Sequence, residues 1–271
     1  MRYWKGSIVL SRTRDYPVLR QVLHSGFITH SQLFEFQRLD CSASSRNAFN
    51  NRVRRLFEHG LLIRGERPFV NQEAVYSLSP AGALELAGLG EHHVQPAGNA
   101  RWTSAQSGLH HSLELNEIHL ALKRSGTLVY WMPETEIRSR NDLTPNGYWK
   151  YYDAIVTVRL AGQDCRFALE YERTPKAARH YLAIRQRIEQ EMSIAHFLYL
   201  VPNRDLLWFV ADRLSECKRA IYFGLFRDFL QQTLTLAVKR SGSPVSLSLD
   251  SILTQRKVAQ RTGALFPDIA V

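Results

Sequence analysis

Three acidic residues in the second half of the chain, Asp153, Glu170 and Glu172, are spaced so that they could bind a metal ion. Segment 165–172 (CRFALEYE) has the composition of a β-strand, from which both glutamates project on the same face. Segment 151–158 (YYDAIVTV) is typical of a partner strand in an antiparallel hairpin and would bring Asp153 beside them. Clustered carboxylates repel each other unless a cation or a proton neutralises them, and such oxygen clusters suit Mg²⁺ or Mn²⁺. A metal ion bound there could activate water against a phosphodiester.

Glu117 is a fourth candidate catalytic residue, on the outer side of a helix predicted over 109–123. The alternative is a scaffold without catalysis, in which the two glutamates of the strand form ion pairs with arginines such as Arg159, Arg166 or Arg185. We expect no cofactor unless the chain is an active nuclease, which would need Mg²⁺ or Mn²⁺.

A helix predicted over 45–59 carries a second set of candidate residues. Its apolar residues Phe49, Val53, Leu56 and Phe57 recur at the spacing of one buried helix face. The opposite face consists of Asn47, Asn50, Asn51, Arg54 and Arg55. Arginine pairs bidentately with guanine and asparagine with adenine in the major groove, so this face predicts a recognition helix. An ordinary solvated helix rich in arginine is the alternative.

The flanking segments indicate how this helix is positioned. Two short amphipathic helices are predicted over 15–25 and 30–39, and strands over 61–64 and 75–78 form a hairpin after it. Three short helices followed by a hairpin, or wing, are typical of a winged helix-turn-helix domain. The residues expected to contact DNA are Ser45, Arg46, Asn47, Asn50, Asn51, Arg54 and Arg55 on the helix, with Arg64 and Arg67 in the wing.

Basic residues are concentrated at the start of the chain. Residues 1–67 contain twelve lysines or arginines against five acids, a net charge of +7, while the whole chain carries +10. Such a concentration favours a polyanionic partner, because each neutralised phosphate adds affinity. An anionic membrane is the competing partner, but no apolar span, signal peptide or basic amphipathic helix with a bulky apolar face is evident. We therefore expect double-stranded DNA as partner and no membrane.

Cysteine and histidine usage gives no indication of a disulfide or zinc site. The three cysteines, Cys41, Cys165 and Cys217, form no CxxC pair, which favours a reducing compartment. The pairs His92-His93 and His110-His111 have no further ligands at metal spacing. We expect a cytoplasmic protein associated with the nucleoid or a plasmid.

The domain organisation follows from these patterns. A winged helix-turn-helix domain is expected over 1–90, a linker rich in Gly, Pro and Ser over 91–107, and an α/β domain over 108–240, with a tail over 241–271. Within the α/β domain and the tail, the pattern also predicts short helices at 215–219 and 251–260.

The order of these segments resembles two families. Asp153 and Glu170 match the first and second acids of the PD-(D/E)xK nuclease core, but Glu172 stands where that motif has lysine, and Tyr152 replaces its proline. A glutamate at the lysine position occurs in some active restriction endonucleases, and Arg173 and Lys176 lie close enough in sequence to substitute.

Over residues 16–229 the chain as a whole resembles the replication-relaxation family. That resemblance implies a winged helix fused to a degenerate PD-(D/E)xK nuclease-like domain, acting in replication, mobilisation or transcription control of a plasmid, phage or integrative element. It rests on RLFEHGLLIR (55–64), VYSLSPAG (75–82), HHSLELNE (110–117), Asp153 and FALEYERT (167–174).

Two classes of function remain open from the sequence. The first is a sequence-specific DNA-binding protein, expected as a homodimer, that regulates a mobile genetic element. The second is a metal-dependent DNA endonuclease targeted by its winged helix. A third idea is an adaptor whose second domain binds a replication or mobilisation protein. Because the motif lacks its lysine, we expect weak or absent nuclease activity.

Overall fold

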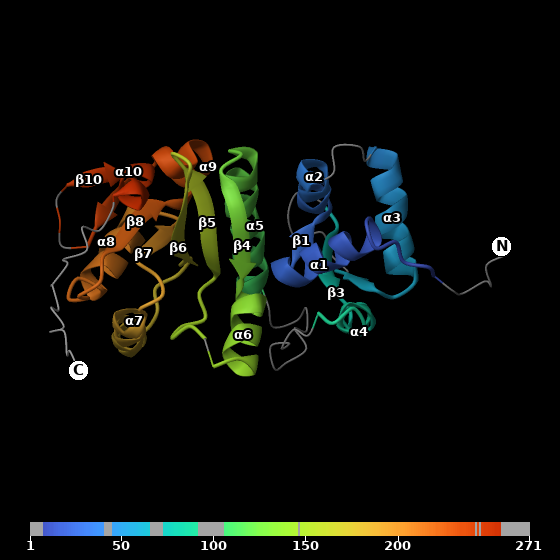
Figure 1. Cartoon of the computed structure of the whole chain (residues 1–271), viewed down its shortest axis with the longest axis horizontal. Helices are drawn as coiled ribbons and strands as arrows, with labels where there is room; N and C mark the ends of the chain where they lie inside the picture. The colour runs from blue at the N-terminus through green and yellow to red at the C-terminus, as the bar shows by residue number, and fades with distance from the viewer. Residues whose placement is uncertain are drawn as a thin grey trace, which may run out of the picture.

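The described residues form two β-sheets. The smaller sheet has three strands and belongs to the N-terminal part of the chain, and the larger has seven and belongs to the C-terminal part (Figure 1). The computed structural model describes residues 8–40, 45–65, 73–91, 106–145, 147–241, 243 and 245–255. Outside these ranges lie Arg67, Cys41, the pair His92-His93 and nearly all of the predicted linker.

The N-terminal part has the winged helix-turn-helix architecture that the sequence predicts. Three helices enclose an apolar core, a hairpin follows them, and a short strand before the second helix pairs with the hairpin. Its elements are α1 (Asp15–Ser25), β1 (Ile28–Thr29), α2 (His30–Asp40), α3 (Arg46–Glu58), β2 (Leu62–Arg64), β3 (Val75–Leu78) and α4 (Pro80–Ala87).

Local sequence signals explain where α3 begins and how it packs. The Ser45 side chain accepts a hydrogen bond from the Ala48 N–H at 3.2 Å and so caps the helix. Phe49 and Val53 are buried in the core of this part, as expected. The prediction for Phe57 was wrong, because its side chain is 41% exposed. It lies about 100° round the helix from Leu56 and about 80° from Phe49, which places it at the edge of the buried stripe.

The C-terminal part is built on the larger sheet, in the order β10-β9-β8-β7-β6-β5-β4. Three consecutive strands form an antiparallel meander, and two strands parallel to its last member extend the sheet. Two antiparallel strands complete the other edge. The strands are β4 (Leu128–Pro133), β5 (Ala154–Leu160), β6 (Gln163–Tyr171), β7 (His196–Val201), β8 (Ile221–Leu225), β9 (Ala237–Arg240) and β10 (Ser246–Ser248).

Helices cover both faces of this sheet, so its central strands are buried on both sides. The succession of helix, three antiparallel strands, helix and parallel strand from α5 to β7 is the PD-(D/E)xK nuclease-like arrangement, with α6 added between β4 and β5. One face of the sheet carries α7 (Ala178–Gln190) and α8 (Arg204–Arg213). The other face carries α5 (Gln106–Arg124), α9 (Phe226–Gln232) and α10 (Leu249–Thr254). Helix α6 (Glu134–Leu143) continues β4, and the 3-10 turn η1 (Thr233–Thr235) follows α9.

Helix α5 packs against both parts of the chain and lies between them in Figure 1. Leu120 belongs to the core of the winged helix, and Asn116 donates a hydrogen bond to the Phe27 carbonyl at 2.8 Å. His119 stacks on Trp131 of β4 with ring centroids 4.2 Å apart. The winged helix is therefore held in a defined orientation relative to the larger sheet.

Several predicted elements differ from those observed. The predicted helix at 215–219 is a pair of turns, with the Cys217 N–H bonded to the Leu214 carbonyl, and the helix of this region is α8 instead. Helix α6 and strands β9 and β10 were not predicted. The tail helix starts earlier than predicted, at Leu249, because Leu249 and Ile252 pack into the core.

Candidate nucleic-acid interface and carboxylate site

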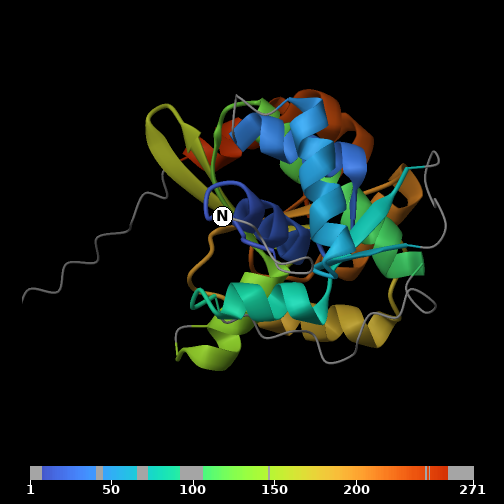
Figure 2. The same cartoon turned by 90° about the vertical axis from the view of Figure 1, so that its right-hand side faces the viewer.

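The outward face of α3 is exposed along its length, and in Figure 2 its ribbon lies in front of the rest of the molecule. Two contacts already order its polar side chains. His30 Nε2 of α2 lies 2.9 Å from Asn50 Oδ1, and Arg54 donates a hydrogen bond to Asn51 Oδ1 at 3.3 Å. At the start of the helix, the guanidinium of Arg46 lies 4.5 Å from the centre of the Phe34 ring. The remaining exposed residues of this face are Ser45, Asn47 and Arg55.

A buried carboxylate anchors α3 to α1. Asp15 is 1% exposed, and its Oδ2 accepts hydrogen bonds from the Ser11 N–H at 2.8 Å and from Arg55 at 2.6 Å. Arg52 forms a second ion pair with it at 3.4 Å. Arg55 is half exposed but tethered by this contact, whereas Asn51 and Arg54 reach solvent without such an anchor. Arg55 is therefore less free to move than Asn51 and Arg54.

The wing is an antiparallel pair with Leu62 opposite Leu78 and Arg64 opposite Tyr76. Arg64 is exposed at the end of β2, and Arg67 lies outside the described residues. Gly82 of α4 packs so closely against the base of the wing that an added Cβ would lie 2.3 Å from the Leu61 carbonyl oxygen.

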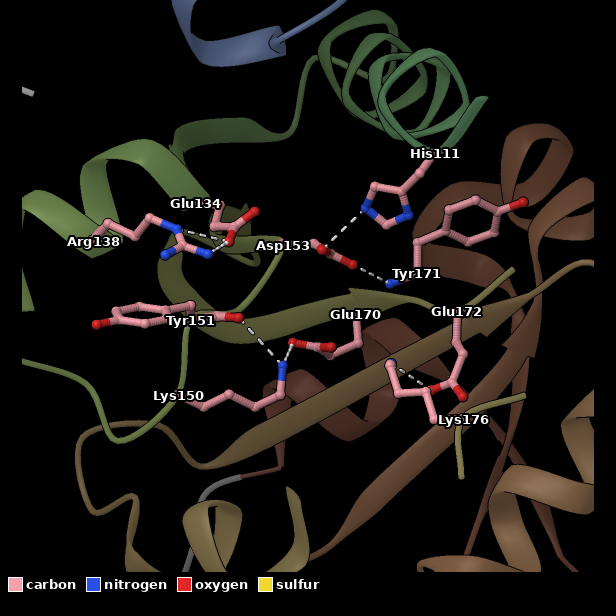
Figure 3. Close-up of polar contacts among 10 residues, drawn as sticks. All are labelled: His111, Glu134, Arg138, Lys150, Tyr151, Asp153, Glu170, Tyr171, Glu172 and Lys176. Atoms are coloured by element: carbon pink, nitrogen blue, oxygen red, sulfur yellow. Dashed lines mark hydrogen bonds and ion pairs between the residues drawn. The ribbon is translucent and has the colours of Figure 1, made fainter. Parts of the chain in front are cut away.

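The structure brings Asp153, Glu170 and Glu172 to one end of the β5–β6 hairpin (Figure 3). Asp153 lies just before β5 and accepts a hydrogen bond from the Tyr171 N–H at 2.7 Å. Its other oxygen lies 3.1 Å from Nε2 of His111, on α5. The His111 ring in turn stacks on Tyr171 at a centroid distance of 5.7 Å.

Each glutamate is paired with a lysine. Glu170 forms an ion pair with Lys150, whose ammonium also donates to the Tyr151 carbonyl at 3.3 Å. Glu172 forms an ion pair with Lys176 at 3.0 Å. Ion pairing of the glutamates was the alternative predicted from the sequence, but these partners are lysines. The three arginines expected as partners contact other residues: Arg159 pairs with Asp164, Arg166 donates to Tyr148, and Arg185 pairs with Glu216.

Burial and neighbouring charges give the two acids of the hairpin opposite pKa shifts. Burial, reinforced by Asp153, raises the pKa of Glu170 to about 7, although Lys150 opposes the shift. Burial also acts to raise the pKa of Asp153, but His111, Lys150 and the Tyr171 N–H outweigh it and hold that pKa below its ordinary value. Burial acts to lower the pKa of His111, yet the Asp153 carboxylate raises it overall. The two acids of the hairpin therefore differ in the pH at which they ionise, Glu170 losing its proton at a higher pH than Asp153.

Glu117 does not join this site. It follows His111 by six residues on α5, which places it about 9 Å along the axis and on another side of the helix. Its carboxylate accepts a hydrogen bond from Gln32 of α2 at 2.8 Å and so belongs to the contact with the winged helix. Glu114, on the same helix, forms an ion pair with Arg173.

Two residues of the site were not predicted from the sequence. Lys150 lies three residues before Asp153, and this proximity is the signal that could have identified it. His111 entered the sequence analysis as half of a histidine pair and within the motif at 110–117, but not as a site residue, because nothing in the sequence places α5 beside β5.

The side chains as arranged do not form a metal-binding set. Within the described residues, no group of three or more His, Cys, Asp or Glu side chains has the geometry to hold a metal ion. Glu170 faces the Lys150 ammonium, and Glu172 accepts hydrogen bonds from Lys176 and from the Tyr181 hydroxyl. A cation bound at Glu170 would compete with the Lys150 ammonium for that carboxylate.

The fold joins a winged helix to a PD-(D/E)xK nuclease-like unit. The chain belongs to the replication-relaxation family, whose family model matches residues 19–189. Among solved structures, the restriction endonuclease FokI bound to DNA aligns with 11% identity and a TM-score of 0.26. The alignment covers 82% of this chain and 44% of that one, so this chain spans less than half of the endonuclease. No curated protein matches the sequence.

The described helices include none that is both long and apolar enough to cross a membrane. Cys165 and Cys217 are free thiols.

Proposed function

We propose that this protein is a sequence-specific DNA-binding protein that acts on a plasmid, phage or integrative element, with α3 as its recognition helix. The observation that supports this most directly is the outward face of α3, where amides and guanidiniums are exposed and Glu58, at its C-terminal end, is the only acid among the helix residues. Membership of the replication-relaxation family supports a role in the replication or mobilisation of such elements.

The proposed readout divides the residues into two groups. Asn47, Asn50, Asn51 and Arg54 are proposed to contact base edges in the major groove, because they project from the exposed face without an ion pair to the core. Phosphate contacts are assigned to Ser45 and Arg46 at the start of the helix, to Arg55 beside Asp15, and to Arg64 and Arg67 of the wing.

We further propose that the protein acts as a homodimer in the cytoplasm, on the nucleoid or a plasmid. Dimeric helix-turn-helix proteins bind two half-sites about one helical turn apart, so a selected site should be an inverted repeat with that spacing. Selection from a random duplex library, followed by sedimentation of the complex, tests both points. A single half-site bound by one protomer would contradict the dimer.

The C-terminal site is proposed to be structural, with Lys150 and Lys176 in place of metal ions as the positive charges that neutralise the carboxylates. The test is incubation of the protein with supercoiled and linear DNA, with and without Mg²⁺ or Mn²⁺, scored for both mobility shift and cleavage. We expect a shift without cleavage.

A second candidate function is a metal-dependent DNA endonuclease. The specific observation that favours it is Lys150, which brings to the carboxylates the ammonium group that the sequence motif lacks. In such an enzyme Asp153 and Glu170 would hold the metal ion and Lys150 would orient the attacking water. Cleavage in Mn²⁺ that is lost in both Asp153→Ala and Glu170→Ala would establish this function and overturn the structural role.

A further inference from the structure

His30, the first residue of α2, links the outward face of α3 to the wing. Its Nε2 lies 2.9 Å from Asn50 Oδ1 on α3, and its Nδ1 lies 3.3 Å from the Tyr76 hydroxyl on β3. The ring packs against two aromatic neighbours, with centroid distances of 5.1 Å to Phe49 and 5.9 Å to Tyr76. The His30 N–H also donates to the Ala74 carbonyl at 2.9 Å. Backbone and ring contacts therefore hold the imidazole in place beside Asn50.

This chain of contacts has a direction. An amide oxygen only accepts hydrogen bonds, so the ring donates from Nε2 to Asn50 Oδ1. A neutral imidazole that donates from Nε2 accepts at Nδ1, and the Tyr76 hydroxyl can supply that hydrogen. One arrangement then satisfies all three groups: Tyr76 donates to His30, and His30 donates to Asn50.

Asn51, the next residue on α3, is turned in the same sense. Its Oδ1 accepts a hydrogen bond from Arg54 at 3.3 Å. Both asparagine oxygens therefore face donors of the protein, and within the part of the chain that the structure describes neither amide nitrogen has a hydrogen-bond partner. The guanidinium of Arg54 has only N–H groups to offer. The exposed face from Asn50 to Arg54 thus presents hydrogen-bond donors to a ligand.

We infer that His30 is a positioning residue for base readout, and that α3 prefers guanine where Asn50 meets the base edges. This inference rests on the DNA-binding role proposed for α3. Guanine presents two acceptors in the major groove, N7 and O6, whereas adenine presents one acceptor and one donor. Pairing of asparagine with adenine uses the amide oxygen, and His30 already donates to that oxygen of Asn50. An adenine at this place would compete with His30, whereas a guanine meets the amide nitrogen that is left.

The first test needs no DNA. Long-range proton–nitrogen spectra of the full-length protein, with isotope-labelled histidine, show which ring nitrogen carries hydrogen, and the His30 signals are those that disappear in His30→Gln. We expect hydrogen on Nε2. Hydrogen on Nδ1 alone would mean that Asn50 donates its amide nitrogen to the ring, so that its oxygen faces the DNA. That result would overturn the inference, and because the wild type is measured, it does not depend on how well a variant folds.

The second test is affinity for the selected duplex and a scrambled duplex at one fixed salt concentration. His30→Ala should weaken binding to the selected duplex about fivefold, because Asn50 must then be ordered on binding, and should leave the scrambled duplex unchanged. His30→Gln keeps an amide N–H that can replace Nε2–H and should retain most of the affinity. His59→Gln, at the C-terminal end of α3, is the matched control and should bind both duplexes as the wild type does.

The base itself is identified with copies of the selected duplex in which single guanines are replaced by 7-deazaguanine, which lacks the N7 acceptor. Replacement of the guanine that Asn50 contacts should weaken wild-type binding about tenfold and have little effect on Asn50→Ala. His30→Ala should cost nothing further in the Asn50→Ala background. Selection of adenine at that position would overturn the preference for guanine.

Failure of this inference can be distinguished from failure of the proposed function. If Asn51→Ala and Arg54→Ala lose the selected duplex while His30→Ala does not, α3 remains the recognition helix and the role of His30 is overturned. Equal losses on both duplexes in His30→Ala would make His30 a structural residue and also overturn the inference. If none of the variants, including Asn51→Ala and Arg54→Ala, distinguishes the two duplexes, the proposed function itself fails.

Discussion

Replacing Glu170 with glutamine should remove a pH dependence of stability that the wild-type protein carries. Burial, reinforced by Asp153 and opposed by Lys150, raises the pKa of Glu170 to about 7 in the folded protein, from an ordinary value of 4.5. Between these two values the unfolded chain has released a proton that the folded protein still holds. The contribution of Glu170 to the free energy of unfolding is therefore fully present below about pH 4.5 and is lost as the pH rises through about 7.

The magnitude follows from the size of the shift. Each pKa unit corresponds to about 1.4 kcal/mol, so the full effect is about 3 kcal/mol, of which about 2–3 kcal/mol falls between pH 5 and pH 8. Glutamine resembles the protonated acid and cannot titrate, so Glu170→Gln should lack this loss. His111, whose pKa is raised mainly by Asp153, titrates in both proteins, so most of its contribution cancels from the difference between their curves; the part of the shift that Glu170 causes does not cancel.

The assay is urea unfolding of the wild type and Glu170→Gln at half-unit steps from pH 5 to pH 8. The free energy of unfolding of the variant should increase relative to that of the wild type as the pH rises. Glu58→Gln, at an exposed position on α3, is the control and should follow the wild-type curve. Parallel curves for the wild type and Glu170→Gln would show that the Lys150 ion pair outweighs burial, and would refute the reasoning.

Three further outcomes are expected. Asp15→Ala should lower the free energy of unfolding by about 2–4 kcal/mol in urea titrations, because it leaves two arginines without their buried partner; a loss below about 1 kcal/mol would contradict that. Gly82→Ala should destabilise the protein in thermal unfolding by about 2 kcal/mol or more, since the new methyl meets the Leu61 carbonyl, and an unchanged midpoint would place α4 elsewhere. Arg64→Ala should weaken binding to all duplexes alike and reduce the salt slope by about 1, whereas an unchanged slope would place the wing away from DNA.

Much of the winged helix could be predicted because its signals are local. The Ser45 cap, the spacing of Phe49 and Val53, and Gly26 with its positive φ of 67° lie within or beside the elements that they define. Phe57 was misplaced because a three-residue stripe already fills the buried face, and sequence spacing alone does not show how wide that face is.

The carboxylate site was predicted only in part, for the same physical reason. Asp153 and Glu170 meet through the register of one hairpin, and short-range alternation is enough to predict such a register. Lys150 and His111 reach them through the packing of a loop and of α5, which no local pattern encodes. Glu117 was assigned to the site because α5 precedes the hairpin, but the helix turns that residue toward α2.

The central claim is that α3 reads DNA sequence, and one measurement tests it most directly. It is the affinity of the wild type, Asn51→Ala and Arg54→Ala for the selected duplex and for a scrambled duplex, at one fixed salt concentration. Each substitution should cost about 1–3 kcal/mol on the selected duplex and much less on the scrambled one. Equal losses on both duplexes would make these residues phosphate contacts and contradict base readout by α3.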